Sequence, residues 1–249
     1  MSIKDKLMTI AENMSKVYDA GVSQGKQDEY DSFWDIYQKN GTRTNYSFAF
    51  AGEGWDADTF KPKYDIIPIT AKYIFAVSLR GLDLEQIFKD LGITFDTSGV
   101  TALDGFEYLC RDTSPSVLPI ISTIGASRLR YTFYNANRLV TIRKLILKDD
   151  GSQTFTNVFP NCPLLENLII EGTIGQNGFD ISGSPKLSKE SITSIINALS
   201  ATTNGLTVTL SNTAVNKAFE TSTGVNDGAN SEEWTTLKAT KSNWTISLA

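Results

Sequence analysis

The chain has 249 residues, of which 41% are hydrophobic and 20% are charged, and its formal net charge is −5. This length accommodates one or two domains with a sizeable core. No run of Lys or Arg offers the concentrated basic face that nucleic acids and anionic membranes require, so we expect neither as a partner.

Histidine is absent from the sequence, which removes the usual general base, catalytic-triad member and zinc ligand. The two cysteines, Cys110 and Cys162, do not complete a four-ligand zinc site, and we expect two buried free thiols. We therefore predict no catalytic residue, no cofactor and no metal site, and a protein that is not an enzyme.

Charges interrupt the first sixteen residues every few positions, and no stretch approaches the roughly 20 apolar residues of a membrane span. We expect no signal peptide, no membrane insertion and folding in the cytoplasm.

Apolar residues at alternating spacings of four and three form a heptad seam near the start of the chain: Ile3, Leu7, Ile10, Met14 and Val17. Two interpretations remain open. The helix packs on its own domain, or it self-associates as a coiled coil, with a trimer as the preferred state. A second amphipathic helix follows, and we assign residues 1–40 to an N-terminal helical segment with a possible role in oligomerisation.

Residues 41–70 are irregular and rich in aromatic side chains. We interpret them as a cap or connector that covers the first apolar layer of the next region. An aromatic binding surface is the alternative.

Residues 71–187 contain a repeat with an offset of 26 residues, in which Phe133, Asn135, Leu139 and Ile142 recur as Phe159, Asn161, Leu165 and Leu168. Weaker copies precede it at Phe75, Ser78 and Leu84 and follow it at Ile181, Gly183, Pro185 and Leu187. Periods in the twenties are typical of leucine-rich repeats. We therefore predict a repeat core made of Phe133, Leu139, Ile142, Phe159, Leu165 and Leu168.

In such a stack each repeat gives one short strand to a parallel ladder. The candidate strands are 82–84, 117–122, 145–148, 168–171, 206–211 and 244–248. A short helix that contains Leu84, Ile87, Phe88 and Leu91 and ends at Gly92 interrupts the series.

Residues 188–249 have a different pattern, which predicts a C-terminal α/β cap. Ser188 is suited to begin a helix that buries Ile192, Ile195, Ile196 and Leu199. Asn230 and Glu233 form a capping-box pair before another helix. The oxygen-rich segment from Asn226 to Glu233 resembles a calcium loop, but we interpret it as a capped turn.

The motifs Phe133-x-Asn135-x-x-x-Leu139-x-x-Ile142 and Phe159-x-Asn161-Cys162-x-x-Leu165-x-x-Leu168 resemble BspA-type leucine-rich repeats. The segments KLILKDDGSQTF, EGTIGQNG and NWTISL, with the N-terminal AENMSKVYDAG, resemble repeat proteins of phages and prophages of gut bacteria. The resemblance implies an α/β leucine-rich-repeat solenoid.

The resemblance also implies a non-enzymatic virion component, such as a tail, fibre or head-decoration protein, that displays its surface for host attachment. Its expected partners are further copies of itself, other virion proteins and a host surface receptor, either protein or glycan. It would be found in the virion or in the cytoplasm of the producing bacterium. A bacterial cell-surface adhesin and a cytoplasmic protein-interaction module are the alternatives.

Overall fold

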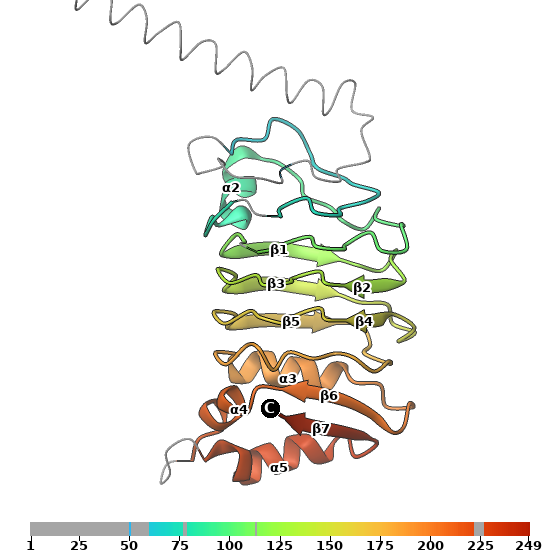
Figure 1. Ribbon diagram of the computed structural model, residues 1–249, viewed down its shortest axis with the longest axis vertical. Helices are drawn as coiled ribbons and strands as arrows, with labels where there is room; N and C mark the ends of the chain where they lie inside the picture. Colours follow the sequence, from blue (N-terminus) through green and yellow to red (C-terminus); the bar gives the residue numbers. More distant parts are fainter. Residues whose placement is uncertain (1–49, 51–59, 77–78, 113, 222–226) are drawn as a thin grey trace, which may run out of the picture. The chain divides into compact units, whose positions relative to one another are not determined.

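The computed structural model describes residues 50, 60–76, 79–112, 114–221 and 227–249, which all belong to the compact unit Thr44–Ala249 (Figure 1). The residues predicted to form a trimer, Ile3, Leu7, Ile10, Met14 and Val17, lie outside the described residues. So do the second predicted helix and most of the aromatic segment.

The main sheet has three parallel strands in the order β1-β3-β5, and Figure 1 shows them lying one below the other. The strands are β1 (Val117–Ser122), β3 (Thr141–Ile146) and β5 (Asn167–Glu171). Leu118 pairs with Ile142, which pairs with Leu168, and all three side chains are fully buried. Successive strands therefore place apolar side chains in one continuous column inside the fold.

The remaining strands of the described region form two smaller parallel sheets. One joins β2 (Arg128–Arg130) to β4 (Thr154–Thr156), and the other joins β6 (Leu206–Leu210) to β7 (Trp244–Leu248). In the first of these, Leu129 and Phe155 are paired and both are buried. The core thus lies between the main sheet and the β2–β4 pair.

The described residues form four α-helices, α2 (Leu84–Leu91), α3 (Lys189–Ala198), α4 (Asn212–Ala218) and α5 (Glu232–Ala239), and one 3-10 helix, η2 (Gly228–Asn230). The predicted end of α2 at Gly92 is confirmed, because this glycine has φ 64° and its N–H donates to the carbonyl oxygens of Phe88 and Lys89 in the last turn. Ser188 is confirmed as the N-cap of α3, where its side chain accepts a hydrogen bond from the Ser191 N–H. None of the helices in the described ranges is long and apolar enough to cross a membrane.

The predicted capping box of α5 is wrong. Asn230 ends η2, and the N-cap is Ser231, whose extended backbone lets its hydroxyl accept the Trp234 N–H at 3.1 Å. The 3-10 turn before the helix therefore moves the cap by one residue, a feature that the Asn-to-Glu spacing does not reveal.

The predicted leucine-rich-repeat solenoid is also wrong, because the described residues form a small α/β fold with short parallel sheets of three, two and two strands. The six candidate strands do not share one ladder. Residues 82–84 make only an isolated bridge, between Asp83 and Val117, before α2 begins. Beyond β5 the neighbouring position is taken by α3, and β6 and β7 pair in a separate sheet. A short apolar run predicts a buried strand, but it does not predict which strand pairs with it.

The six residues predicted as the repeat core are all fully buried: Phe133, Leu139, Ile142, Phe159, Leu165 and Leu168. Phe133 and Phe159 stack with their ring centres 4.9 Å apart and 17° between the ring planes. The local repeat of 26 residues therefore brings equivalent side chains into contact, although it does not extend into a solenoid.

Candidate functional site

Four tyrosines gather on one side of the fold and form a ladder of stacked rings, which we call the tyrosine ladder: Tyr73, Tyr108, Tyr131 and Tyr134. The ring centres of Tyr73 and Tyr108 are 4.9 Å apart, and those of Tyr108 and Tyr131 are 5.1 Å apart with planes only 3° from parallel. Tyr134 meets both Tyr108 and Tyr131 nearly at right angles. All four side chains are half-buried, so part of each faces solvent.

The backbone positions the three stacked tyrosines in the same way in successive turns of the chain. Each lies two residues before a fully buried side chain, namely Phe75, Cys110 or Phe133. The N–H groups of these three buried residues each donate to the next turn, Phe75 to Leu109 O, Cys110 to Thr132 O and Phe133 to Val158 O, all at 3.0 Å. Because each turn bonds to the next at equivalent atoms, the side chains two residues earlier stack on one another.

The same three tyrosines adopt left-handed backbone conformations, with φ of 54° for Tyr73, 54° for Tyr108 and 50° for Tyr131. This region is unfavourable for a bulky side chain and costs about 1–2 kcal/mol per residue. The equivalent residue in the next turn is Asn157, with φ 46°, a residue type that tolerates the region far better. Three tyrosines in successive turns thus occupy a backbone conformation that asparagine adopts more easily.

Arginines and carboxylates surround the ladder and pair with one another. The guanidinium of Arg111 lies 4.9 Å from the ring centre of Tyr108, and that of Arg130 lies 5.3 Å from the ring centre of Tyr131. Arg111 also pairs with Asp112 at 2.8 Å, and Arg130 lies 3.6 Å from Glu107. The rings and their charged neighbours therefore hold each other in place, which lowers the side-chain entropy lost on binding a partner.

The pKa of Tyr108 is raised, first by burial and then by its neighbour Tyr73, while Arg111 opposes the shift. The phenol of Tyr108 is accordingly neutral near pH 7. A neutral hydroxyl both donates and accepts hydrogen bonds, as a partner with mixed polar groups requires.

A second row of side chains follows the same turns. Asn161 donates its side-chain N–H to Asn135 Oδ1, and Asn135 donates in turn to Asp112 Oδ1 at 3.2 Å. Asp112 also bonds the Arg111 guanidinium, so this polar row is joined to the tyrosine ladder. The two rows together present ring edges, hydroxyls, amides and a paired arginine on one surface.

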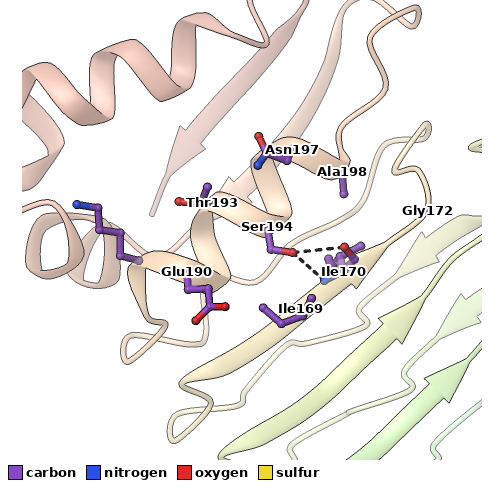
Figure 2. Close-up of a pocket in the computed structure, with 9 residues that line it drawn as sticks. Ile169, Ile170, Gly172, Glu190, Thr193, Ser194, Asn197 and Ala198 are labelled. Carbon is purple, nitrogen blue, oxygen red and sulfur yellow. Dashed lines mark hydrogen bonds between the residues drawn. The ribbon is translucent and has the colours of Figure 1, made fainter.

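A groove of about 760 Å³ lies between β5 and α3 and is the other candidate (Figure 2). Its central hydroxyl, Ser194 Oγ, already accepts the Ile170 N–H at 2.8 Å and donates to Ile170 O, as Figure 2 shows. One helical turn earlier, Ser191 Oγ accepts the Leu168 N–H at 2.8 Å and donates to Glu166 O. These serines close the outer edge of β5, so the hydroxyl at the centre of the groove serves the fold.

The two cysteines are free and buried, in agreement with the expectation of two free thiols. Burial raises the pKa of Cys162 to about 12 and raises that of Cys110 well above its ordinary value. Thiols in such an environment remain protonated near pH 7 and lack the activated thiolate of a nucleophile. In the described ranges no group of three or more His, Cys, Asp or Glu side chains is placed to hold a metal ion.

The sequence reasoning missed the tyrosine ladder because it aligned the repeats on their apolar positions. The signal lies two residues before those positions, where tyrosine occurs three times, at irregular spacings of 35 and 23 residues. The spacing becomes meaningful only when Phe75, Cys110 and Phe133 are known to be equivalent. Comparison with protein-family models, curated proteins and solved structures finds no significant match.

Proposed function

We propose that this chain is a non-enzymatic attachment protein, a virion component of a phage or prophage, that contacts a host surface receptor through the tyrosine ladder. The observation that carries the proposal is the ordered stack of Tyr73, Tyr108 and Tyr131 with arginines against two of its rings. Tyrosine and arginine, with tryptophan, are the side chains that most often dominate binding energy at protein interfaces. The resemblance of the repeat motifs to phage proteins supplies the biological setting.

A protein receptor fits the ladder better than a glycan does. Sugars bind aromatic side chains mainly through free ring faces, whereas the stacked neighbours cover both faces of Tyr108. A partner therefore meets Tyr108 at its ring edge and hydroxyl, which suits packing and hydrogen bonding with a mixed polar surface.

Attachment is tested with the purified full-length chain, labelled with a fluorophore and incubated with intact cells of the host bacterium. The variants are Tyr108→Ala and Tyr131→Ala, and the matched control is Tyr64→Ala, an exposed tyrosine outside the ladder. We expect each ladder variant to weaken cell binding at least about tenfold, as the loss of a hot-spot residue does, and the control to bind like the unchanged chain. Equal binding by all four proteins would contradict the proposal.

The virion setting has its own test. Particles purified from the producing bacterium are digested and analysed by mass spectrometry for peptides of this chain. Recovery in particles supports the virion component. Recovery on the surface of intact cells would identify a bacterial adhesin instead, and recovery only in the cytoplasmic fraction would identify an interaction module.

A further inference from the structure

The last strand of the chain, β7, has an outer edge that nothing else in the described ranges pairs with, because its one partner there is β6. The Ala249 N–H donates to Leu210 O at 3.1 Å, and Asn243 O accepts the Gly205 N–H at 3.0 Å. Backbone groups of a strand alternate in direction, so Thr245 and Ser247 also face β6. The N–H and C=O groups of Ile246 and Leu248 therefore point outward, away from β6.

The edge of β7 differs from the edge of β5, which the hydroxyls of Ser191 and Ser194 close. Natural proteins protect exposed edges with charged residues, proline, bulges or a covering element. The β7 sequence Trp-Thr-Ile-Ser-Leu contains no charge and no proline, and its pairing with β6 runs without a bulge. Such an edge is a template for another strand.

The sequence of β7 is complementary to itself when it is read in the opposite direction. If two copies pair antiparallel about a twofold axis at Ile246, Trp244 lies opposite Leu248 and Thr245 lies opposite Ser247. Apolar side chains then meet apolar ones and hydroxyls meet hydroxyls, which are favourable cross-strand pairs. The edge therefore fits a second copy of the same strand.

The charges of α5 favour the same arrangement. This helix carries Glu232 and Glu233 in its first turn, of which Glu233 already pairs with Lys189, and Lys238 in its last turn. A short turn connects it to β7. An axis that makes the β7 copies antiparallel also makes the α5 copies antiparallel, since each helix is fixed to its own strand. The acidic end of one helix then lies toward the basic end of the other.

We propose that β7 is a dimerisation edge, at which a second copy of the chain adds its own β7 antiparallel to form one sheet in the order β6-β7-β7-β6. Twofold symmetry closes this contact after two copies, so the association stops at a pair. The inference does not depend on the proposed receptor surface, which lies on other residues.

The test is the mass of the full-length chain by sedimentation at micromolar concentration. Ile246→Lys places two like charges opposite each other at the axis, so we expect this variant to form particles of half the mass of the unchanged chain. Ile246→Glu should do the same, and an equal mixture of the two variants should regain the full mass. If the predicted N-terminal trimer also forms and its three β7 edges pair with one second trimer, the masses change from six chains to three, and the halving remains.

Two further variants make the result decisive. Thr154→Lys, a charge on an exposed position of β4, should keep the full mass. Ile246→Pro removes the outward N–H without removing a bond to β6, so it should also halve the mass. It provides the test if the lysine variant fails to fold. An unchanged chain of the same mass as folded Ile246→Lys or Ile246→Pro would overturn the proposal.

Discussion

Two aromatic stacks are built by the same turns of this protein, one inside the fold and one on its surface. Phe133 and Phe159 stack with ring centres 4.9 Å apart, and Tyr108 and Tyr131 stack at 5.1 Å. The phenylalanines are fully buried, whereas the tyrosines are half-buried and have charged neighbours. The two stacks thus have nearly the same ring geometry, but burial makes one a source of stability, while partial exposure is the basis on which we propose the other as a receptor contact.

The largest expected effect is on the free energy of unfolding, and it differs between the two stacks. Phe159→Ala leaves a cavity beside Phe133 and should lower the free energy of unfolding by about 3–5 kcal/mol. Tyr131→Ala removes a half-buried ring from a strained backbone position and should cost about 1–2 kcal/mol. Urea unfolding of both variants measures the difference. Equal losses would mean that the surface stack supports the fold as strongly as the core does.

The pH dependence of the free energy of unfolding gives a second prediction, which concerns the buried thiols. The folded-state pKa of Cys162, about 12, lies above the ordinary thiol value of 9.0. Above pH 9 the unfolded chain therefore loses a thiol proton that the folded chain keeps, and stability should fall from pH 9 toward pH 12 by up to about 1.4 kcal/mol per pH unit for this group.

The control for the pH effect is the double variant Cys110→Ala and Cys162→Ala, whose unfolding should change less between pH 9 and pH 11. Denaturant midpoints across this range provide the measurement. A double variant with the same pH slope as the unchanged chain would show that the thiols do not contribute. Tyr108, whose pKa is also raised, adds a loss in the same direction that both proteins share.

The direct contact within each stack is a smaller quantity, which double-mutant cycles isolate. We expect coupling energies of about 0.5–1.5 kcal/mol both for Phe133 with Phe159 and for Tyr108 with Tyr131, since the ring geometries are alike. The cycles use leucine replacements and urea unfolding. Coupling confined to the buried pair would show that solvent cancels the attraction between the tyrosine rings.

The smallest expected effect is that of Tyr131→Asn on stability. Asn157 occupies the equivalent backbone position one turn later with φ 46°, so asparagine at 131 should leave the free energy of unfolding within about 1 kcal/mol of the original. Binding to host cells should nevertheless fall with the loss of the ring. Retained binding by this stable variant would remove Tyr131 from the attachment surface.

The sequence alone determined the local features of this protein. Periodic apolar residues with a glycine after them predicted α2, and a serine before an apolar face predicted α3, because these signals act within a few residues of each other. The offset of 26 residues identified Phe133 and Phe159 as equivalent, and the structure stacks them. The lack of histidine excluded a histidine general base and a histidine metal ligand before any contact was known.

Tertiary structure decided where the strand ladder ends and which side chains share the surface. Ser191 and Ser194 close β5 because a helix turn brings their hydroxyls to alternate N–H groups of that strand, a match between two elements that no local pattern encodes. Tyr73, Tyr108 and Tyr131 are separated by unequal lengths of chain, yet they stack because backbone bonds between successive turns align them. The order of such residues along the chain can be read from the sequence. Their neighbours in space follow only from hydrogen bonds between distant backbone groups.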